Sequence, residues 1–312
     1  MNVSKTGKNG KRKMDNKKGV DPFFYTYNSM RKISLVFICI TALVRAQEIE
    51  PTEADAILDD FFISDSLDLL DLFDDLKKQD YLYVTVLYNS KTLFSGRDFG
   101  VEQYSAFPSV SYIDGNNFFA NLSSGYYSNV SPNWDFVTFS GGYSNYINKK
   151  KTLLATGVYS YSSYTQDVAD LNNHRISAGL SYRKKWFRNS LTSGYLFGGA
   201  SSSFVSNNMY ISIDLLDTKT LDISVQPRFG LFWGNQTDRQ EFVRYRPFRR
   251  EVIDTNYFQL LNTEFSIPVE FDFGDWDIEI DYTFSSPNSL PSEEALENIG
   301  YISFSVGYLI GL

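Results

Sequence analysis

Cysteine and histidine are nearly absent from this 312-residue sequence, which holds only Cys39 and His174. Cys39 lies inside a short apolar run near the N-terminus, which a secretory signal peptide would remove. The exported chain would then contain no thiol, disulfide or cysteine-ligated metal. Metal-ligand spacings, a Gly-x-Ser-x-Gly motif and glycine-rich phosphate loops are also missing. We therefore expect no catalytic residues, no metal site and no cofactor.

The sequence has no apolar run of about 20 residues, the length that a membrane-spanning helix needs. The run at residues 33–44 is shorter; it follows Met30-Arg31-Lys32 and precedes the small residue Ala46. A positive start, a short apolar core and a small residue before the cut are typical of a signal peptide. We expect residues 1–46 to be an N-terminal extension and signal peptide, with Met30 as the true start and cleavage after Ala46.

Positive charge is scarce in the remainder of the chain. Residues 1–46 hold ten Lys/Arg and two Asp/Glu, so residues 47–312 keep 29 − 10 = 19 basic and 37 − 2 = 35 acidic residues, a net charge of −16. Proteins that bind nucleic acid gain affinity from basic contacts to phosphates. The charge balance therefore argues against a nucleic-acid partner.

From Tyr81 to Leu312 the sequence alternates apolar and polar residues in about twelve stretches, as strands with two different faces do. The expected strands are 81–89, 104–113, 117–128, 134–147, 152–164, 173–184, 187–200, 208–216, 220–234, 257–273, 276–285 and 299–312. A transmembrane barrel and a soluble sandwich both produce this alternation.

The lengths of the gaps between these strands separate the two folds. Short turns at 114–116, 147–151, 184–186, 217–219 and 274–275 alternate with longer loops at 90–103, 165–172, 235–256 and 286–298. Outer-membrane barrels have short periplasmic turns, longer external loops and an even strand number. All four tryptophans also fall at expected strand ends, as in interfacial girdles. We predict an all-β fold, an antiparallel transmembrane β-barrel of about 12 strands over residues 81–312.

An acidic segment, residues 47–80, precedes the barrel and has helical spacing of its apolar residues. These are Ile57, Leu58, Phe61, Phe62, Leu67, Leu70, Phe73 and Leu76, with Asp and Glu on the other faces. We expect a periplasmic helical segment. Two roles stay open: a short amphipathic helix resting at the barrel mouth, or a plug or docking element for a periplasmic partner.

Carboxylates gather on one face of two neighbouring expected strands. They are Glu264, Glu270, Asp272, Asp277, Glu279 and Asp281. Paired carboxylates could act as acid and base. We favour the alternative that they form an acidic lumen wall. His174, the other candidate for chemistry, shares a strand face with lipid-facing Ile176 and Leu180, so we interpret it as a rim residue without a catalytic role.

The loop expected at 235–256 carries an arginine cluster interleaved with aromatic residues. Its arginines are Arg239, Arg244, Arg246, Arg249 and Arg250. Arginine binds phosphate and carboxylate groups bidentately. Two interpretations stay open: the loop folds into the barrel mouth against the acidic wall, or it faces outward and binds lipopolysaccharide phosphates or an anionic solute.

The chain resembles the outer-membrane β-barrel proteins of Bacteroidota-type bacteria over roughly residues 47–312. The resemblance lies in Ala46-Gln47, the acidic segment, the loop at 95–100 and the C-terminal strand. It implies the fold rather than an activity. The last strand is similar to the signal that the barrel-assembly machinery recognises, with Leu312 where Phe is usual. The residues of this assembly signal are Phe304, Val306, Tyr308, Ile310 and Leu312.

These observations favour an outer-membrane barrel that acts as a narrow, porin-like channel for a small solute. Eight-stranded barrels are filled by side chains and sixteen-stranded ones hold an aqueous channel, so twelve strands predict a narrow or plugged pore. Two alternatives remain: a structural or partner-binding barrel, including an accessory of a secretion machinery, and a lipid-modifying enzyme. Membrane lipid and lipopolysaccharide, the barrel-assembly machinery and a small solute are the expected partners.

Overall fold

The computed structural model describes residues 80–312 except 95–96, 99–101, 166–170, 200, 246–247 and 291–294. For residue 94, residues 97–98 and residues 237–255 it describes the backbone alone. All described residues belong to one compact unit, Gln47–Leu312. The expected signal peptide and the acidic segment up to residue 79 lie outside the described residues. No helix in the described part of the chain is long and apolar enough to cross a membrane.

The described chain consists of strands. They are β1 (Tyr81–Asn89), β2 (Leu93–Phe94), β3 (Arg97–Asp98), β4 (Ser105–Ile113), β5 (Phe118–Tyr127), β6 (Trp134–Tyr146), β7 (Leu153–Tyr164), β8 (His174–Lys184), β9 (Phe187–Phe197), β10 (Ser202–Ile211), β11 (Ile213–Asp217), β12 (Asp222–Val225), β13 (Arg228–Tyr245), β14 (Phe248–Phe273), β15 (Trp276–Pro287) and β16 (Ile299–Gly311). β2 and β3 form a separate two-stranded sheet.

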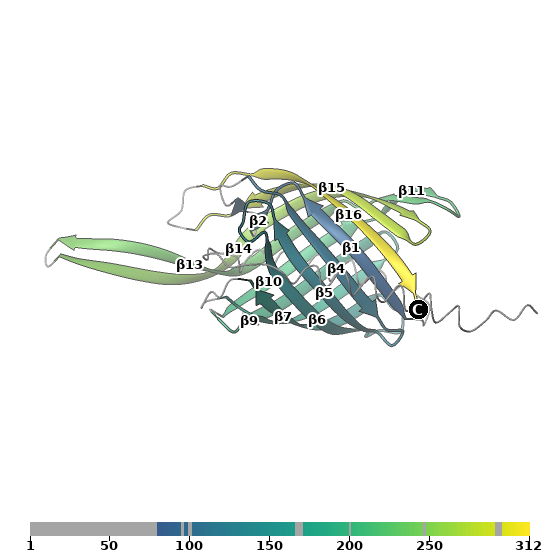
Figure 1. Cartoon of the computed structure of the whole chain (residues 1–312), viewed down its shortest axis with the longest axis horizontal. Coiled ribbons are helices and arrows are strands. Elements are labelled where there is room, and N and C mark those ends of the chain that lie inside the picture. Colours follow the sequence, from purple (N-terminus) through teal and green to yellow (C-terminus); the bar gives the residue numbers. More distant parts are fainter. Residues whose placement is uncertain are drawn as a thin grey trace, which may run out of the picture. The chain divides into compact units, whose positions relative to one another are not determined.

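The other strands close into one antiparallel barrel. Their order is β11-β12-β14-β13-β10-β9-β8-β7-β6-β5-β4-β1-β16-β15, and a further β14–β15 pairing joins the ends of this sheet. β10 and β11 follow one another with a break at Ser212, and β12 and β13 with a break at Gln226-Pro227. Counted as continuous, they give the twelve strands of the prediction, which is confirmed (Figure 1).

The first and last strands form the closing seam. β1 pairs with β16 along its whole length, from Tyr81↔Gly311 to Asn89↔Ser303. Closure matters because a bilayer offers no partner to an unpaired backbone N–H or C=O group. The predicted C-terminal strand is thus the closing strand, whereas its recognition by the assembly machinery stays a prediction.

Alternate residues of each strand face the two sides of the barrel wall. On β14 and β15, Phe265, Tyr282 and Phe284 are exposed, while Ser266 and Thr283 are fully buried. In a closed barrel the buried face is the lumen and the exposed face meets lipid. The outer face carries the apolar and aromatic belt that a bilayer requires.

Short turns and both described chain ends lie at the same end of the barrel. The turns connect β4 to β5, β6 to β7, β8 to β9, β11 to β12 and β14 to β15. Outer-membrane barrels place such turns on the periplasmic side, so we call this end the periplasmic end. The short turns that the sequence predicted are confirmed, and all of them lie at this end, whereas the gaps at the other end vary in length from the short β9–β10 connection to the long segments before β4 and β16.

Asp80 fastens the periplasmic end. Its carboxylate accepts hydrogen bonds from the Gly115 N–H (3.2 Å) and the Tyr112 hydroxyl (2.8 Å), and its carbonyl accepts one from the Leu312 N–H (2.9 Å). The donors hold the pKa of the Asp80 carboxyl below its usual range, the Gly115 N–H most strongly. The resulting stabilisation is present above the ordinary carboxyl pKa and is lost as the pH falls through the lowered value.

Two of the predicted boundaries are wrong. The strand expected at 208–216 begins at Ser202, because Ser202 to Asn208 pair with β9 although they lack regular apolar alternation. The segment 235–256 is not a loop: β13 and β14 stay paired up to Tyr245↔Phe248. Figure 1 shows this hairpin projecting beyond the barrel at the end opposite the C-terminus. A hairpin outside the membrane does not have to turn an apolar face to lipid, so no apolar alternation marks it.

Aromatic side chains on the lumen face lie over glycines of the neighbouring strand. A Cβ added at Gly307 would overlap the Tyr83 ring, and one added at Gly142 would overlap Phe119. Gly307 thereby lets Tyr83 reach from β1 across β16, where its hydroxyl donates a hydrogen bond to Asp277 on β15 (2.9 Å). This contact reinforces the seam with side chains from three strands.

Gly307→Ala should destabilise the closing seam. The added methyl group displaces the Tyr83 ring, which should lower the free energy of unfolding by about 1–3 kcal/mol, the usual cost of overpacking. The measurement is the urea midpoint of the heat-modifiable gel shift. Gly157→Ala is the matched control, because nothing lies within 4 Å of a Cβ added there. Equal midpoints for the two variants would contradict this account of the seam.

Candidate functional site: the barrel lumen

The six predicted wall carboxylates occupy the lumen-facing parity of β14 and β15. Register places Asp272 opposite Asp277 and Glu270 opposite Glu279. Asp222 on β12 extends the row, since it pairs with Asp272. Like charges directly opposite one another repel. This end of the lumen therefore favours cations and water close to the carboxylates, and the role of the row in ion selection stays a prediction.

Polar neighbours hold several of these carboxylates. Glu270 accepts hydrogen bonds from the Ser224 hydroxyl (2.9 Å) and from the Gln226 amide. Asp281, which is 3% exposed, accepts from the Thr283 hydroxyl (2.8 Å) and forms an ion pair with Arg228 (3.4 Å). The wall is thus a built polar surface rather than a row of freely moving side chains.

Four arginines on the lumen face were missed by the sequence analysis. They are Arg175 and Arg183 on β8, Arg188 on β9 and Arg228 on β13. Arg183 and Arg188 lie directly opposite one another. The guanidinium groups of Arg175 and Arg188 lie over the rings of Phe204 (4.7 Å) and Tyr210 (5.1 Å). Strand parity was the available signal, because Arg175 and Arg183 alternate with lipid-facing Ile176 and Leu180.

Hydroxyl groups line the part of the lumen between the seam and the arginines. On β6 and β7 they pair across the strands: Thr138 with Ser162 (2.7 Å), Ser140 with Ser160 (2.8 Å) and Ser144 with Thr156 (3.0 Å). These side chains are short and satisfy one another. They make this wall polar without filling the space in front of it.

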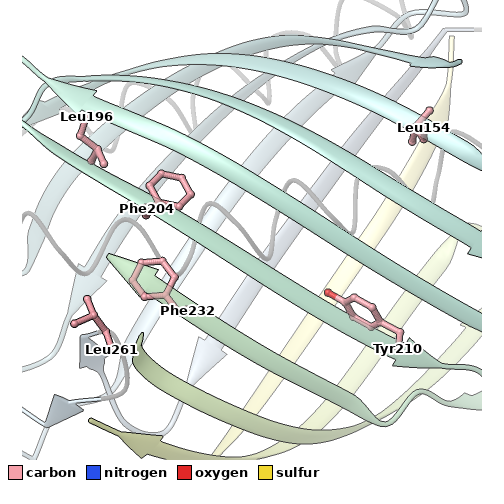
Figure 2. Close-up of a cluster of buried hydrophobic side chains, with 6 residues drawn as sticks. All are labelled: Leu154, Leu196, Phe204, Tyr210, Phe232 and Leu261. Carbon is pink, nitrogen blue, oxygen red and sulfur yellow. The ribbon is translucent and has the colours of Figure 1, made fainter. Parts of the chain in front are cut away.

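Large apolar side chains also face the lumen. One cluster contains Leu154, Leu196, Phe204, Tyr210, Phe232 and Leu261, drawn in Figure 2. Phe204 and Phe232 stack at 6.0 Å between ring centroids. A register shift between Phe232 and Trp233 opposes Phe232 to Asn262 and Trp233 to Leu260, and both Leu261 and Asn262 are buried. The sequence analysis did not anticipate an apolar surface inside the barrel.

A second and a third apolar cluster lie on the other half of the wall. One joins Phe107, Tyr127 and Phe136, and the other joins Tyr83, Ile113 and Phe119. Water-filled barrel interiors are polar. Besides the hydroxyl groups and these two clusters, the lumen therefore has an acidic face on β14–β15 and a mixed apolar and arginine face centred on β8, β9, β10 and β13.

The two remaining candidates of the sequence analysis lie outside the lumen or outside the described side chains. His174 faces outward, as predicted: its ring stacks on Phe197 (5.1 Å) and its Nδ1 lies 2.8 Å from the Tyr159 hydroxyl oxygen. The five arginines of the β13–β14 hairpin fall within residues whose side chains are not described. The backbone of Arg239, Arg244, Arg249 and Arg250 is paired between the two strands, and Arg246 lies outside the described residues. The ligand of these arginines stays a prediction.

No family model matches the sequence, and no curated protein matches it. The KdgM porin is similar over 73% of this chain and 98% of its own length, with 8% identity and a TM-score of 0.44. The NanC porin matches over 74% and 99%, with 12% identity and a TM-score of 0.41. An outer-membrane channel from Pseudomonas putida F1 matches over 84% and 100%, with 10% identity and a TM-score of 0.45. With TM-scores below 0.5, these similarities do not decide what this chain does.

Glu270→Gln combined with Glu279→Gln should reduce cation selectivity. Removing two facing negative charges weakens the attraction for cations, so the cation-to-anion permeability ratio should fall on the order of two-fold. Reversal potentials in a KCl gradient across planar bilayers measure this ratio. Asp217→Asn with Asp275→Asn removes the same charge from exposed turns and serves as the control. A ratio that changes equally in both double variants would exclude a special role for the wall.

Proposed function

We propose that this chain is an outer-membrane channel of narrow bore that conducts small polar solutes with a preference for cations. The observation that carries the proposal is the acidic surface of β14–β15, together with the hydroxyl groups of β6–β7, inside a closed twelve-stranded barrel. Charged groups lining a pore select the opposite charge and replace part of the hydration of a solute. A purely structural barrel has no need for facing pairs of lumen carboxylates such as Glu270 and Glu279, because like charges directly opposite one another are destabilising.

We also propose a route to that membrane. The apolar outer belt and the sorted turns support the location. The run at 33–44 supports export by a signal peptide cleaved after Ala46, and the apolar C-terminal strand supports assembly by the barrel-assembly machinery. The chain is proposed to be a barrel of the Bacteroidota type, on the residues at 46–47, 95–100 and 299–312. Recovery of the protein in a soluble periplasmic fraction would contradict the location.

Planar-bilayer recordings test the channel directly. The protein purified from outer membranes should give small, discrete conductance steps with a cation-selective reversal potential. Heat-modifiable migration on gels verifies that the barrel is folded in each preparation. A folded barrel that gives no steps at any voltage, in the wild type and in the variants of the next subsection, would exclude the channel and favour a partner-binding role.

The arginines of the β13–β14 hairpin form a second binding element in this proposal. The hairpin projects away from the barrel (Figure 1), which supports an outward position for the arginines and contact with lipopolysaccharide phosphates. The acidic wall lies nearer the opposite end of β14, at 264–272. Of the two interpretations left open by the sequence, the outward one is therefore proposed.

Replacing Arg244, Arg246, Arg249 and Arg250 by Ser should weaken lipopolysaccharide binding on the order of ten-fold, because charge-assisted phosphate contacts are lost. Wild-type binding should weaken as salt rises, and single-channel conductance should not change. Binding to immobilised lipopolysaccharide at several salt concentrations measures the effect. Ser at four exposed periplasmic lysines, Lys149, Lys150, Lys151 and Lys185, is the matched control. A rise in conductance and cation selectivity would instead place the arginines in the mouth.

A further inference from the structure

Several large side chains of the lumen wall are deeply buried. Phe204 is 1% exposed and Leu261 3%, and even the long side chains Arg175 and Arg188 are only 7% and 8% exposed. Side chains fill the interior of an eight-stranded barrel, whereas a twelve-stranded one is wider. Much of this wall consists of serine, threonine and glycine, which reach a short way into the lumen. Wall residues cover part of this surface, since Arg175 lies over Phe204 and Phe232 stacks beside it. In front of the short side chains, a barrel of this width has room for a further segment that would cover the rest.

The apolar and charged side chains of this part of the lumen wall determine which segment could bind there. The cluster around Phe204 and Leu261 requires apolar side chains, because exposed hydrocarbon in water costs about 25 cal/mol per Å². The facing pair Arg183 and Arg188, with Arg175 further along β8, makes this side of the lumen positive, so it attracts negative charge. An occupant must therefore be amphipathic and acidic. The carboxylates of β14–β15 would repel such an occupant, so it would lie against β8, β9, β10 and β13.

Residues 51–79 of this chain have that chemistry. They contain nine Asp or Glu and two Lys, and their apolar residues recur at helical spacing. A helix rises about 1.5 Å per residue, so 29 residues span at most roughly 44 Å. The apolar band of an outer-membrane barrel is about 25 Å tall. The segment is thus long enough to pass through the lumen, or to enter it as two shorter helices.

The C-terminal end of residues 51–79 is attached at the periplasmic end of the barrel. Residue 79 precedes Asp80, which is held at the periplasmic rim by Gly115, Tyr112 and Leu312. A segment attached there reaches the lumen at no more entropic cost than closing a short loop. A separate periplasmic protein would need to present the same acidic and apolar pattern and would also lose the entropy of association.

We propose that residues 51–79 lie inside the lumen of their own barrel, with their carboxylates at Arg175, Arg183 and Arg188 and their apolar face on the Phe204–Leu261 cluster. The occupant fills the arginine side and leaves a narrow path along the carboxylates of β14–β15. The proposal takes the channel proposed above as its setting, but the position of the segment is tested independently of conduction.

A buried cysteine reports on the occupant. Ser190→Cys is placed on the lumen face of β9, where Ser190 is 3% exposed, in a Cys39→Ser background that leaves it as the only thiol. Its rate of reaction with a small uncharged maleimide is measured in the full chain, folded in vesicles. The plug variant replaces Asp65, Asp68, Asp71, Asp74 and Asp75 by Asn. The control variant replaces five exposed acidic residues outside the lumen, Glu102, Asp214, Asp217, Asp275 and Glu297, by Gln or Asn.

The plug variant should react at least about ten-fold faster than the wild type, and its conductance should rise several-fold, while the control variant matches the wild type in both. Equal rates in all three would overturn the proposal and would leave 51–79 as a docking element for a periplasmic partner. Faster reaction without any conductance step would uphold the position of the segment and contradict the channel. Conductance steps with no difference in rate would uphold the channel and contradict the occupant.

Cross-linking covers the case in which the plug variant does not fold. Leu67→Cys, Leu70→Cys and Phe73→Cys are each combined with Ser190→Cys, and separately with Asp214→Cys on the exposed strand β11. Mild oxidation of the folded barrel should form a disulfide with position 190 in at least one pair and with position 214 in none. Cross-links to position 214 alone, or no cross-link in any pair, would place the segment outside the lumen.

Discussion

The structure depends on the pairing of β1 with β16. A bilayer cannot hydrogen-bond to an open strand edge, so every strand between these two is held only if the ring closes. Side-chain hydrogen bonds reinforce this seam. Tyr83 crosses β16 over Gly307 to reach Asp277, and Asp80 connects the start of β1 with the β4–β5 turn and with Leu312. The charge at Asp277 thus belongs both to the lumen wall and to the closure of the barrel.

Closure gives each strand one face toward lipid and one face toward the lumen. Polar and charged side chains, which are unfavourable in lipid, therefore face the lumen. Strand parity sends Arg175 and Arg183 inward with the serines of β8, just as it sends Ile176 and Leu180 outward. Large rings are accepted on the lumen face because glycines such as Gly142 and Gly194 lie beneath them. Aromatic rings can therefore lie against the lumen wall over these glycines instead of projecting into the lumen.

Much of this fold could be predicted from the sequence, because lipid imposes a strict alternation on β14, β15 and β16. The alternation fails where the constraint is absent. In Ser202 to Asn208 the apolar residues Phe204 and Val205 are adjacent rather than alternate, so the start of β10 was missed. Pro227 interrupts the strand that continues β12 into β13. The hairpin of 235–256 projects beyond the barrel, where lipid imposes no alternation on its residues. The acidic row was visible as a pattern, whereas the Phe204 cluster was not, since it is assembled from five strands through registers and a bulge.

The acidic face and the apolar face of the lumen differ in whether water stabilises them. The facing pairs Asp272–Asp277 and Glu270–Glu279 bring like charges together, and water or cations beside them weaken the repulsion, so this side of the lumen favours water. The side built from Phe204, Leu196 and Leu261 is stable only if water is excluded from it. A lumen filled with water would solvate the carboxylates but would also wet the apolar cluster, and a lumen filled with side chains would do the opposite. The proposed position of residues 51–79 against the apolar cluster satisfies both surfaces. The water-filled path that remains along the carboxylates of β14–β15 is then narrow.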